Sequence, residues 1–206
     1  MRKRFLFCIS LLLLTAVACE KETERMEDYV ADFATVVREN DAVKFLLDNN
    51  RLLTPSPPSD YTGKDGQRVV ISYTPLHGDS VKIRQVGAIF TDGIRPDGYP
   101  ERWAHDPVKI QSIWVGGGYL NMILEVEYHS KSHVIALLRD PSSETNDLYF
   151  SHSRADDPAG YPKKMYASFR LSELRTAGHE EEAVPFRLII YTDEGLRKME
   201  FVLPSE

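Results

Sequence analysis

Residues 106–128 carry the clearest signal of the fold, and they read Asp-Pro-Val-Lys-Ile-Gln-Ser-Ile-Trp-Val-Gly-Gly-Gly-Tyr-Leu-Asn-Met-Ile-Leu-Glu-Val-Glu-Tyr. Two β-rich apolar runs, Val108–Trp114 and Leu120–Tyr128, flank three consecutive glycines, which is the pattern of a β-hairpin. A phosphate-binding loop also carries glycines, but no Lys-Ser or Lys-Thr follows and the next segment is not helical. We therefore predict a flexible hairpin turn here.

Similar runs, each bounded by Gly, Pro, Asn or Asp, recur along the chain and predict an all-β protein. The eleven candidate strands are 30–38, 42–48, 68–74, 80–91, 108–114, 120–128, 133–139, 147–152, 166–171, 186–192 and 198–203. The first is ambiguous, since Met26, Tyr29, Val30, Phe33 and Val37 also share one helical face. We choose a strand, because the Asn40-Asp41 turn signal is followed at once by alternating apolar residues.

Turn-forming residues divide the strands into two groups. The three prolines between Leu53 and Gly66 remove ladder donors, so this segment is predicted to be a surface loop. A second break, Asp92–Pro107, marks the predicted domain boundary. The strands before it suit a small barrel over 28–104, and the later strands suit a β-sandwich over 105–206.

The first residues resemble a bacterial lipoprotein signal. Arg2, Lys3 and Arg4 precede a 14-residue apolar run that ends immediately before Cys19, too short for a spanning helix. Small residues ahead of that cysteine resemble a lipobox, which predicts a signal peptide over 1–18 and diacylated Cys19 as the membrane anchor. The alternative is an ordinary secreted protein in which Cys19 is incidental.

Charge narrows the classes of partner. Removal of the signal leaves 22 basic and 31 acidic residues, a formal net charge of −9, so nucleic-acid binding is not expected. Residues 20–27 read Glu-Lys-Glu-Thr-Glu-Arg-Met-Glu, and we predict an acidic tether over 19–27. These acidic residues also resemble the surface-export signal of some Bacteroidetes lipoproteins, so both interpretations stay open.

Three further stretches resemble one family. They are Phe45–Leu53, Lys64–Tyr73 and Asp106–Asn121, in this order and spacing behind the lipobox-like segment. Together they are similar to the NigD-like lipoproteins of Bacteroidetes. The resemblance implies an N-terminal OB-like barrel followed by a C-terminal β-sandwich, and it implies no known activity or catalytic residue.

Histidines, serines and carboxylates are the residues in this sequence that could form a metal or catalytic site. His129 and His133 could face each other across a hairpin, but a third metal ligand is missing, so we predict no metal and no cofactor. Ser151-His152-Ser153 lacks the Gly-x-Ser-x-Gly elbow of a nucleophile. Paired carboxylates remain an alternative, which would make the protein a glycan-active enzyme of the envelope.

The candidate ligand contacts lie in two loops in which Gly-Tyr-Pro is followed by basic and aromatic residues, and they are Tyr99, Arg102, Trp103, Tyr161, Lys163 and Lys164. Loop aromatics beside charge suit stacking on sugars or packing on proteins. The other interpretation is that these tyrosines pack the ends of the β domains. We predict a non-enzymatic lipoprotein of the cell envelope with a binding or assembly role, whose ligand would be an envelope protein or a glycan. Its lipid would anchor it to the outer membrane, on the periplasmic or the surface face.

Overall fold

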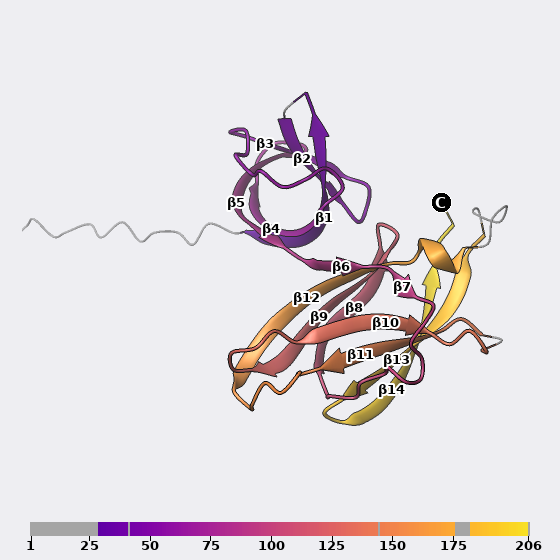
Figure 1. Ribbon diagram of the computed structural model, residues 1–206. Coiled ribbons are helices and arrows are strands. Elements are labelled where there is room, and N and C mark those ends of the chain that lie inside the picture. Colours follow the sequence, from indigo (N-terminus) through magenta and orange to yellow (C-terminus); the bar gives the residue numbers. More distant parts are fainter. Residues whose placement is uncertain (1–28, 41, 144, 176–181, 206) are drawn as a thin grey trace, which may run out of the picture.

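The computed structural model describes residues 29–40, 42–143, 145–175 and 182–205. The predicted signal peptide, the acylation site Cys19 and the acidic tether all lie outside these residues. Within them, no helix is both long and apolar enough to span a bilayer. Figure 1 shows strands arranged as a barrel at one end of the molecule and a pair of sheets at the other, so the all-β prediction is confirmed.

Five strands close into the barrel in the spatial order β1-β2-β3-β5-β4. They are β1 (Val30–Glu39), β2 (Ala42–Leu47), β3 (Leu52–Pro55), β4 (Arg68–Pro75) and β5 (Ser80–Ala88). The ambiguous first segment is a strand, because Ala34 and Val36 alternate into the barrel core with Phe45, Leu53 and Ile71. Closure gives every barrel strand a neighbour on both sides and leaves no free edge.

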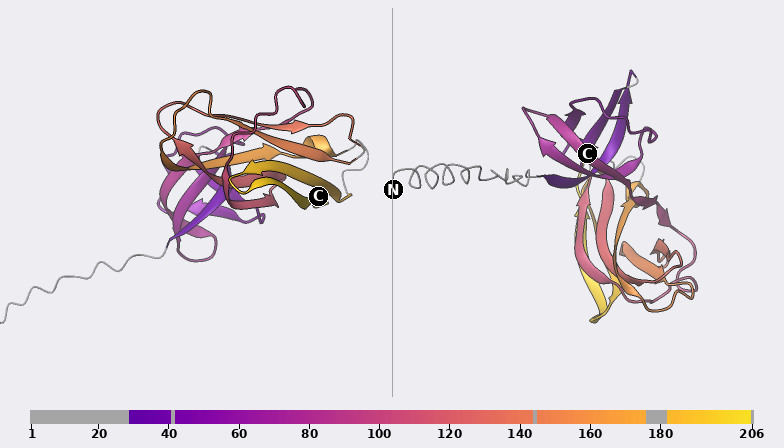
Figure 2. Two further views of the ribbon diagram at one scale, coloured as in Figure 1. Left: turned by 90° about the horizontal axis from the view of Figure 1, so that it is seen from below. Right: turned by 90° about the vertical axis from the view of Figure 1, so that its left-hand side faces the viewer.

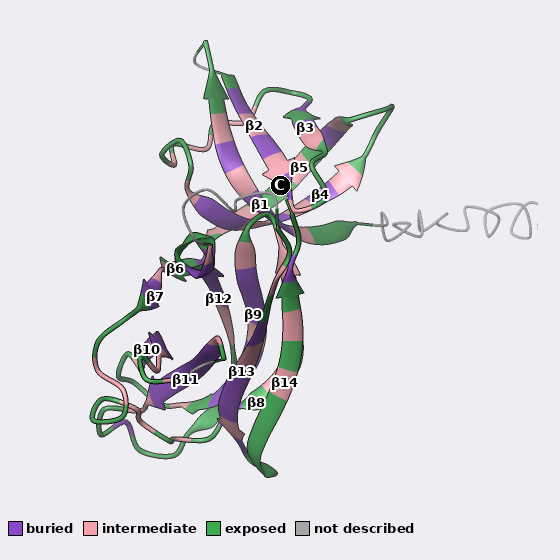
Figure 3. Ribbon diagram, turned by 90° about the vertical axis from the view of Figure 1, so that its right-hand side faces the viewer, coloured by how far each residue is buried: buried purple, intermediate pink, exposed green. Residues whose placement is uncertain are grey.

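Two further sheets pack face to face as a β-sandwich, in the orders β14-β13-β11-β10-β7 and β6-β12-β9-β8. Their strands are β6 (Phe90–Asp92), β7 (Ile94–Arg95), β8 (Lys109–Gly116), β9 (Tyr119–Tyr128), β10 (Val134–Arg139), β11 (Asp147–Ser153), β12 (Tyr161–Arg170), β13 (Val184–Thr192) and β14 (Gly195–Leu203). A short 3₁₀ helix, Ser172–Leu174, follows β12. Figure 3 shows that β11 is largely buried, whereas β14 is largely exposed along its length.

The strand predictions differ from the structure at several strands. β7 was not predicted, and β12 begins at Tyr161, five residues before the predicted start, so Tyr161, Lys163 and Lys164 lie on a strand and not in the predicted loop. Leu52–Pro55 forms β3, although its last three residues were assigned to a surface loop, because Thr54 and Pro55 pair in parallel with Ser80 and Val81 of β5. The run 80–91 divides into β5 and β6, and β6 joins the sandwich by pairing with β12. The sandwich sheets thus begin at Phe90, ahead of the predicted boundary. Such short parallel pairings leave no periodic pattern in the sequence, so the sequence does not reveal this start.

The barrel and the sandwich meet around one buried arginine. Arg68 of β4 is 1% exposed, and its guanidinium donates to Asp48 Oδ1 at 2.7 Å and to Asn121 Oδ1 at 2.8 Å. The guanidinium carbon also lies 4.6 Å from the centre of the Tyr119 ring, a cation–π distance. Asn121 and Tyr119 belong to β9, so one barrel side chain is bound directly by the sandwich.

The carboxylate of Asp48 is the second centre of this junction. It also accepts hydrogen bonds from Trp114 Nε1 at 3.3 Å and from Asn121 Nδ2 at 2.9 Å. The glycine hairpin leaves the space that this carboxylate needs, since a Cβ on Gly117 would lie 2.7 Å from Asp48 Oδ1. Gly117 also has a φ of 59°, a conformation that suits glycine. Gly116 and Gly117 therefore bring the hairpin between β8 and β9 close to the Asp48 carboxylate of the barrel.

Candidate binding site

The first predicted loop packs its aromatic residues against the protein itself. Tyr99 stacks on Tyr149 with ring centres 3.9 Å apart, and Trp103 Nε1 donates to the Phe150 carbonyl oxygen at 3.1 Å. Both rings cover the outer face of the five-stranded sheet. Arg102 points to solvent, with Asp97 at 3.5 Å. The charged side chains Asp97 and Arg102 of this loop are therefore exposed, while its two aromatic rings join a small outer cluster.

The second predicted set places two of its three residues at one end of the sandwich. Tyr161, which is 56% exposed, lies edge-on to Tyr128 with ring centres 5.9 Å apart. The ammonium of Lys163 lies 3.6 Å from the centre of the Tyr128 ring, a close cation–π contact. We call Tyr128, Tyr161 and Lys163 the end patch. Lys164 pairs with Glu125 in the register of β12 and β9, which places it on the opposite face of the sheet.

The end patch lies far from the barrel. β9 and β12 pair over ten residues, from Tyr119 and Arg170 beside the barrel to Tyr128 and Tyr161. At about 3.3 Å per residue, this places the patch about 30 Å from the junction. The right-hand view of Figure 2 shows the same extension of the sandwich away from the barrel.

A buried carboxylate holds the loops beneath the end patch. Asp157 accepts hydrogen bonds from the backbone N–H groups of His129, Ser130 and Lys131 at 2.8, 2.9 and 2.9 Å. Burial opposes ionisation, but these three donors outweigh it and hold the pKa of Asp157 well below its usual range. Gly160 approaches closely as well, because a Cβ there would collide with the Tyr128 carbonyl oxygen. These contacts therefore fix the backbone next to Tyr128 and Tyr161 of the end patch.

Two histidines extend this support into the sandwich. His133 Nδ1 lies 2.9 Å from His152 Nε2, and His152 Nδ1 lies 2.9 Å from the Asp106 carbonyl oxygen. His152 must then donate to that carbonyl and accept from His133. Burial lowers the pKa of His152, more than its bond to the Asp106 carbonyl raises it, and His133 lowers it further. Burial therefore favours the neutral form of His152.

The histidines and Ser151 make structural contacts within the sandwich. His133 binds His152 and Asp157, and no cluster of three metal-ligating side chains occurs among the described residues. Ser151 donates to the Arg102 carbonyl oxygen at 3.0 Å and accepts from the Ala104 N–H at 2.9 Å. Its hydroxyl thus ties the first aromatic loop to β11. The pairing of His133 with His152 was missed, because strand pairing alone brings them together.

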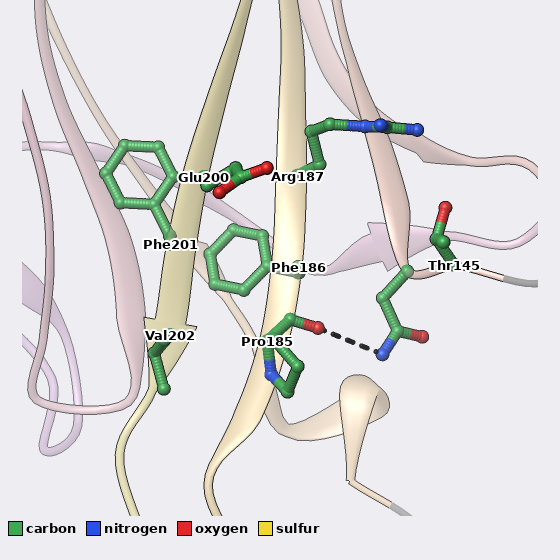
Figure 4. Close-up of a pocket in the computed structure, with 8 residues that line it drawn as sticks. Thr145, Pro185, Phe186, Arg187, Glu200, Phe201 and Val202 are labelled. Atoms are coloured by element: carbon green, nitrogen blue, oxygen red, sulfur yellow. Dashed lines mark hydrogen bonds between the residues drawn. The ribbon is translucent and has the colours of Figure 1, made fainter.

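A groove of about 740 Å³ lies along β13 and β14 and contains none of the end-patch residues. Figure 4 shows the Phe186 and Phe201 side chains within it, with Pro185 and Val202 nearby. At its rim, Arg187 donates to both carboxylate oxygens of Asp147 at 2.9 and 2.6 Å. Burial opposes the ionisation of Asp147, but the hydrogen bonds from Arg187 and Thr145 keep the pKa of this carboxyl group below its usual range. No feature of the sequence pointed to this groove.

Two family models match the chain in tandem. The NigD-like N-terminal OB domain matches residues 33–90, and the NigD-like C-terminal beta sandwich domain matches residues 94–201. These ranges follow the observed barrel and the two packed sheets. No curated protein sequence matches the chain.

Solved structures show the same two-domain arrangement. A protein of Parabacteroides distasonis, provisionally named as toxin related, is 28% identical, with a TM-score of 0.74 over 87% of this chain and 95% of its own. A NigD-like immunity protein of Bacteroides caccae is 25% identical, with a TM-score of 0.70 over 86% and 97%. A provisionally named lipoprotein of Bacteroides fragilis is 12% identical, with a TM-score of 0.59 over 87% and 98%, and shares the fold. With both of its domains matched, the chain belongs to the NigD-like family.

Proposed function

We propose that this protein is a lipid-anchored, non-catalytic binding protein of the bacterial cell envelope that holds a protein partner at its end patch. The observation that carries the proposal is the exposed Tyr161 ring beside Lys163, both fixed on paired strands. An aromatic ring beside a cation suits the apolar centre and charged rim of a protein interface. The immunity protein of Bacteroides caccae supports a protein partner by its name.

The anchor is the lipid predicted at Cys19. The name of the Bacteroides fragilis protein supports this site, as does the lipobox-like sequence ahead of it. Two or more acyl chains would hold the protein firmly at the outer membrane. The test is metabolic labelling with a clickable fatty acid, comparing the parent protein with Cys19→Ser. We expect label in the parent alone, and an unlabelled parent would overturn the anchor.

A binding role fits the groove better than glycan hydrolysis does. Paired-carboxylate hydrolysis requires two carboxyl groups flanking one bond. Among the described residues that line the groove on β13 and β14, Glu200 has the one carboxylate, and both oxygens of the rim carboxylate Asp147 are bound by Arg187. The matching family descriptions name no enzyme.

The partner proposal is tested by photo-crosslinking in intact cells. A benzophenone amino acid replaces Tyr161 in one strain and Leu76 in the control strain, since Leu76 is 52% exposed on the barrel. We expect one protein adduct of defined mass from position 161 and none from position 76, with a several-fold lower yield after Lys163→Glu. A glycan adduct, or equal adducts from both positions, would overturn the protein partner at this patch.

A further inference from the structure

The edges of the two sandwich sheets differ in how they are protected from further pairing. β6 and β7 are only three and two residues long. β8 is interrupted by a register shift between Ile110 and Ser112, which disrupts an edge. β14 instead pairs with β13 over nine residues without any shift. Within the described sandwich, β14 is the long, regular strand with a free edge, the kind of edge that accepts another strand.

The side chains of β14 divide between two faces. Leu188 and Ile190 of β13 point into the main core, so their partners Met199 and Arg197 share the inner face. Ile189 belongs to the outer cluster, so its partner Lys198 shares the outer face. By alternation, Leu196, Lys198, Glu200 and Val202 form the outer row of β14.

This outer row is complementary to itself. When two copies of β14 run antiparallel with Met199 opposite Met199, Lys198 of each copy falls opposite Glu200 of the other. Leu196, 45% exposed, then falls opposite Val202, 53% exposed. Shifting the register by two residues would oppose Lys198 to Lys198 or Glu200 to Glu200, and like charges directly opposite are destabilising. Charge and exposed apolar side chains thus select one register.

We infer that β14 is a dimerisation strand, through which two copies of this chain join their five-stranded sheets into one continuous sheet across a twofold axis. Such an interface is isologous, so each favourable pair occurs twice. In this register Leu196 of the second copy falls opposite Val202, which lines the apolar groove shown in Figure 4. The end patch takes no part in this pairing, so the inference is independent of the proposed partner.

The test is a charge exchange on the full lipid-bearing protein in detergent micelles, followed by sedimentation equilibrium. We expect a concentration-dependent dimer whose dissociation constant rises about tenfold in Lys198→Glu and in Glu200→Lys. The double variant Lys198→Glu/Glu200→Lys should return to the parent value, because opposite charges face each other again. Lys82→Glu, on the exposed face of barrel strand β5, is the matched control and should leave the dimer unchanged.

A second readout does not depend on charge. Met199→Cys in isolated envelope membranes should give a dimer with a short bismaleimide crosslinker, whereas Leu76→Cys on the barrel should not. A parent protein that stays monomeric at about 100 μM, far above the micromolar range of weak specific association, would overturn the inference. A dimer that the double exchange fails to restore, or one that crosslinks equally at both cysteines, would place the contact on another surface and overturn it as well.

Discussion

Replacing Asp48 with alanine should destabilise the protein more than a substitution of any exposed residue, because it leaves the buried Arg68 charge at the domain junction without its carboxylate partner. Arg68 is 1% exposed and is held by Asp48, Asn121 and Thr35, with its nearest contact the 2.7 Å bond to Asp48. The substitution also removes the acceptor for Trp114 Nε1. Arg68 lies on β4, the barrel strand that faces the sandwich in Figure 1.

The size of the effect follows from the burial of the pair. Breaking a buried ion pair on one side costs about 3–5 kcal/mol, since the remaining charge stays out of water. The Asp48 side chain is 15% exposed, so water screens part of the interaction and the lower end applies, about 3 kcal/mol. With a urea dependence of about 2 kcal/mol per molar, the unfolding midpoint should fall by about 1.5 M.

The assay is urea unfolding followed by tryptophan fluorescence and far-ultraviolet circular dichroism. Trp114 reports the junction directly, and the double variant Asp48→Ala/Arg68→Met completes a mutant cycle. We expect the double variant to be more stable than Asp48→Ala alone, because no buried charge is left unpaired. A cost below about 1 kcal/mol for Asp48→Ala, or additive single effects in the cycle, would refute the reasoning.

Further outcomes concern the hairpin, acid stability and the first aromatic loop. Gly117→Ala should lower the melting temperature more than Gly118→Ala does, because both glycines have positive φ but only at position 117 would a Cβ meet the junction carboxylate. On acidification, the free energy of unfolding should fall first below about pH 6.5, because His152 binds a proton more readily in the unfolded chain than in the folded one. It should fall again below about pH 4, because the unfolded chain then binds a proton at Asp157 while the folded chain still holds this carboxylate ionised. His152→Gln should remove the first step and Asp157→Asn the second, each followed by urea titration against pH. Trp103→Ala should cost about 3 kcal/mol in the same titration, since the ring packs against the outer cluster, and an unchanged midpoint would contradict that packing.

Most strands could be predicted from local pattern. The alternation around the glycine hairpin and at the first ambiguous segment placed β9 and β1 within one residue of their observed bounds. β3 and β7 were missed, because one lies beside prolines and the other holds two residues, so neither shows a period. Both are stabilised by parallel pairing with strands distant in sequence.

The candidate contacts could be found by composition but not placed. Two Gly-Tyr-Pro loops look alike in sequence, yet Tyr99 is stacked on the five-stranded sheet while Tyr161 is exposed at the end of the sandwich. The difference arises from the surface each loop crosses. Tyr149 lies beneath the first tyrosine, whereas the second starts a strand at the edge of the core.

Alternating apolar residues and turn-forming residues were sufficient to predict an all-β chain with a barrel ahead of a sandwich, because a strand with one buried face has an apolar residue at every second position. Only the tertiary structure decided how Arg68, Asp48 and Asn121 join the domains and which aromatic rings stay exposed. Those contacts link residues 20 to 73 positions apart. Contacts between residues so far apart in the sequence are made by strand pairing and domain packing. These depend on the whole chain and leave no local pattern in any one segment.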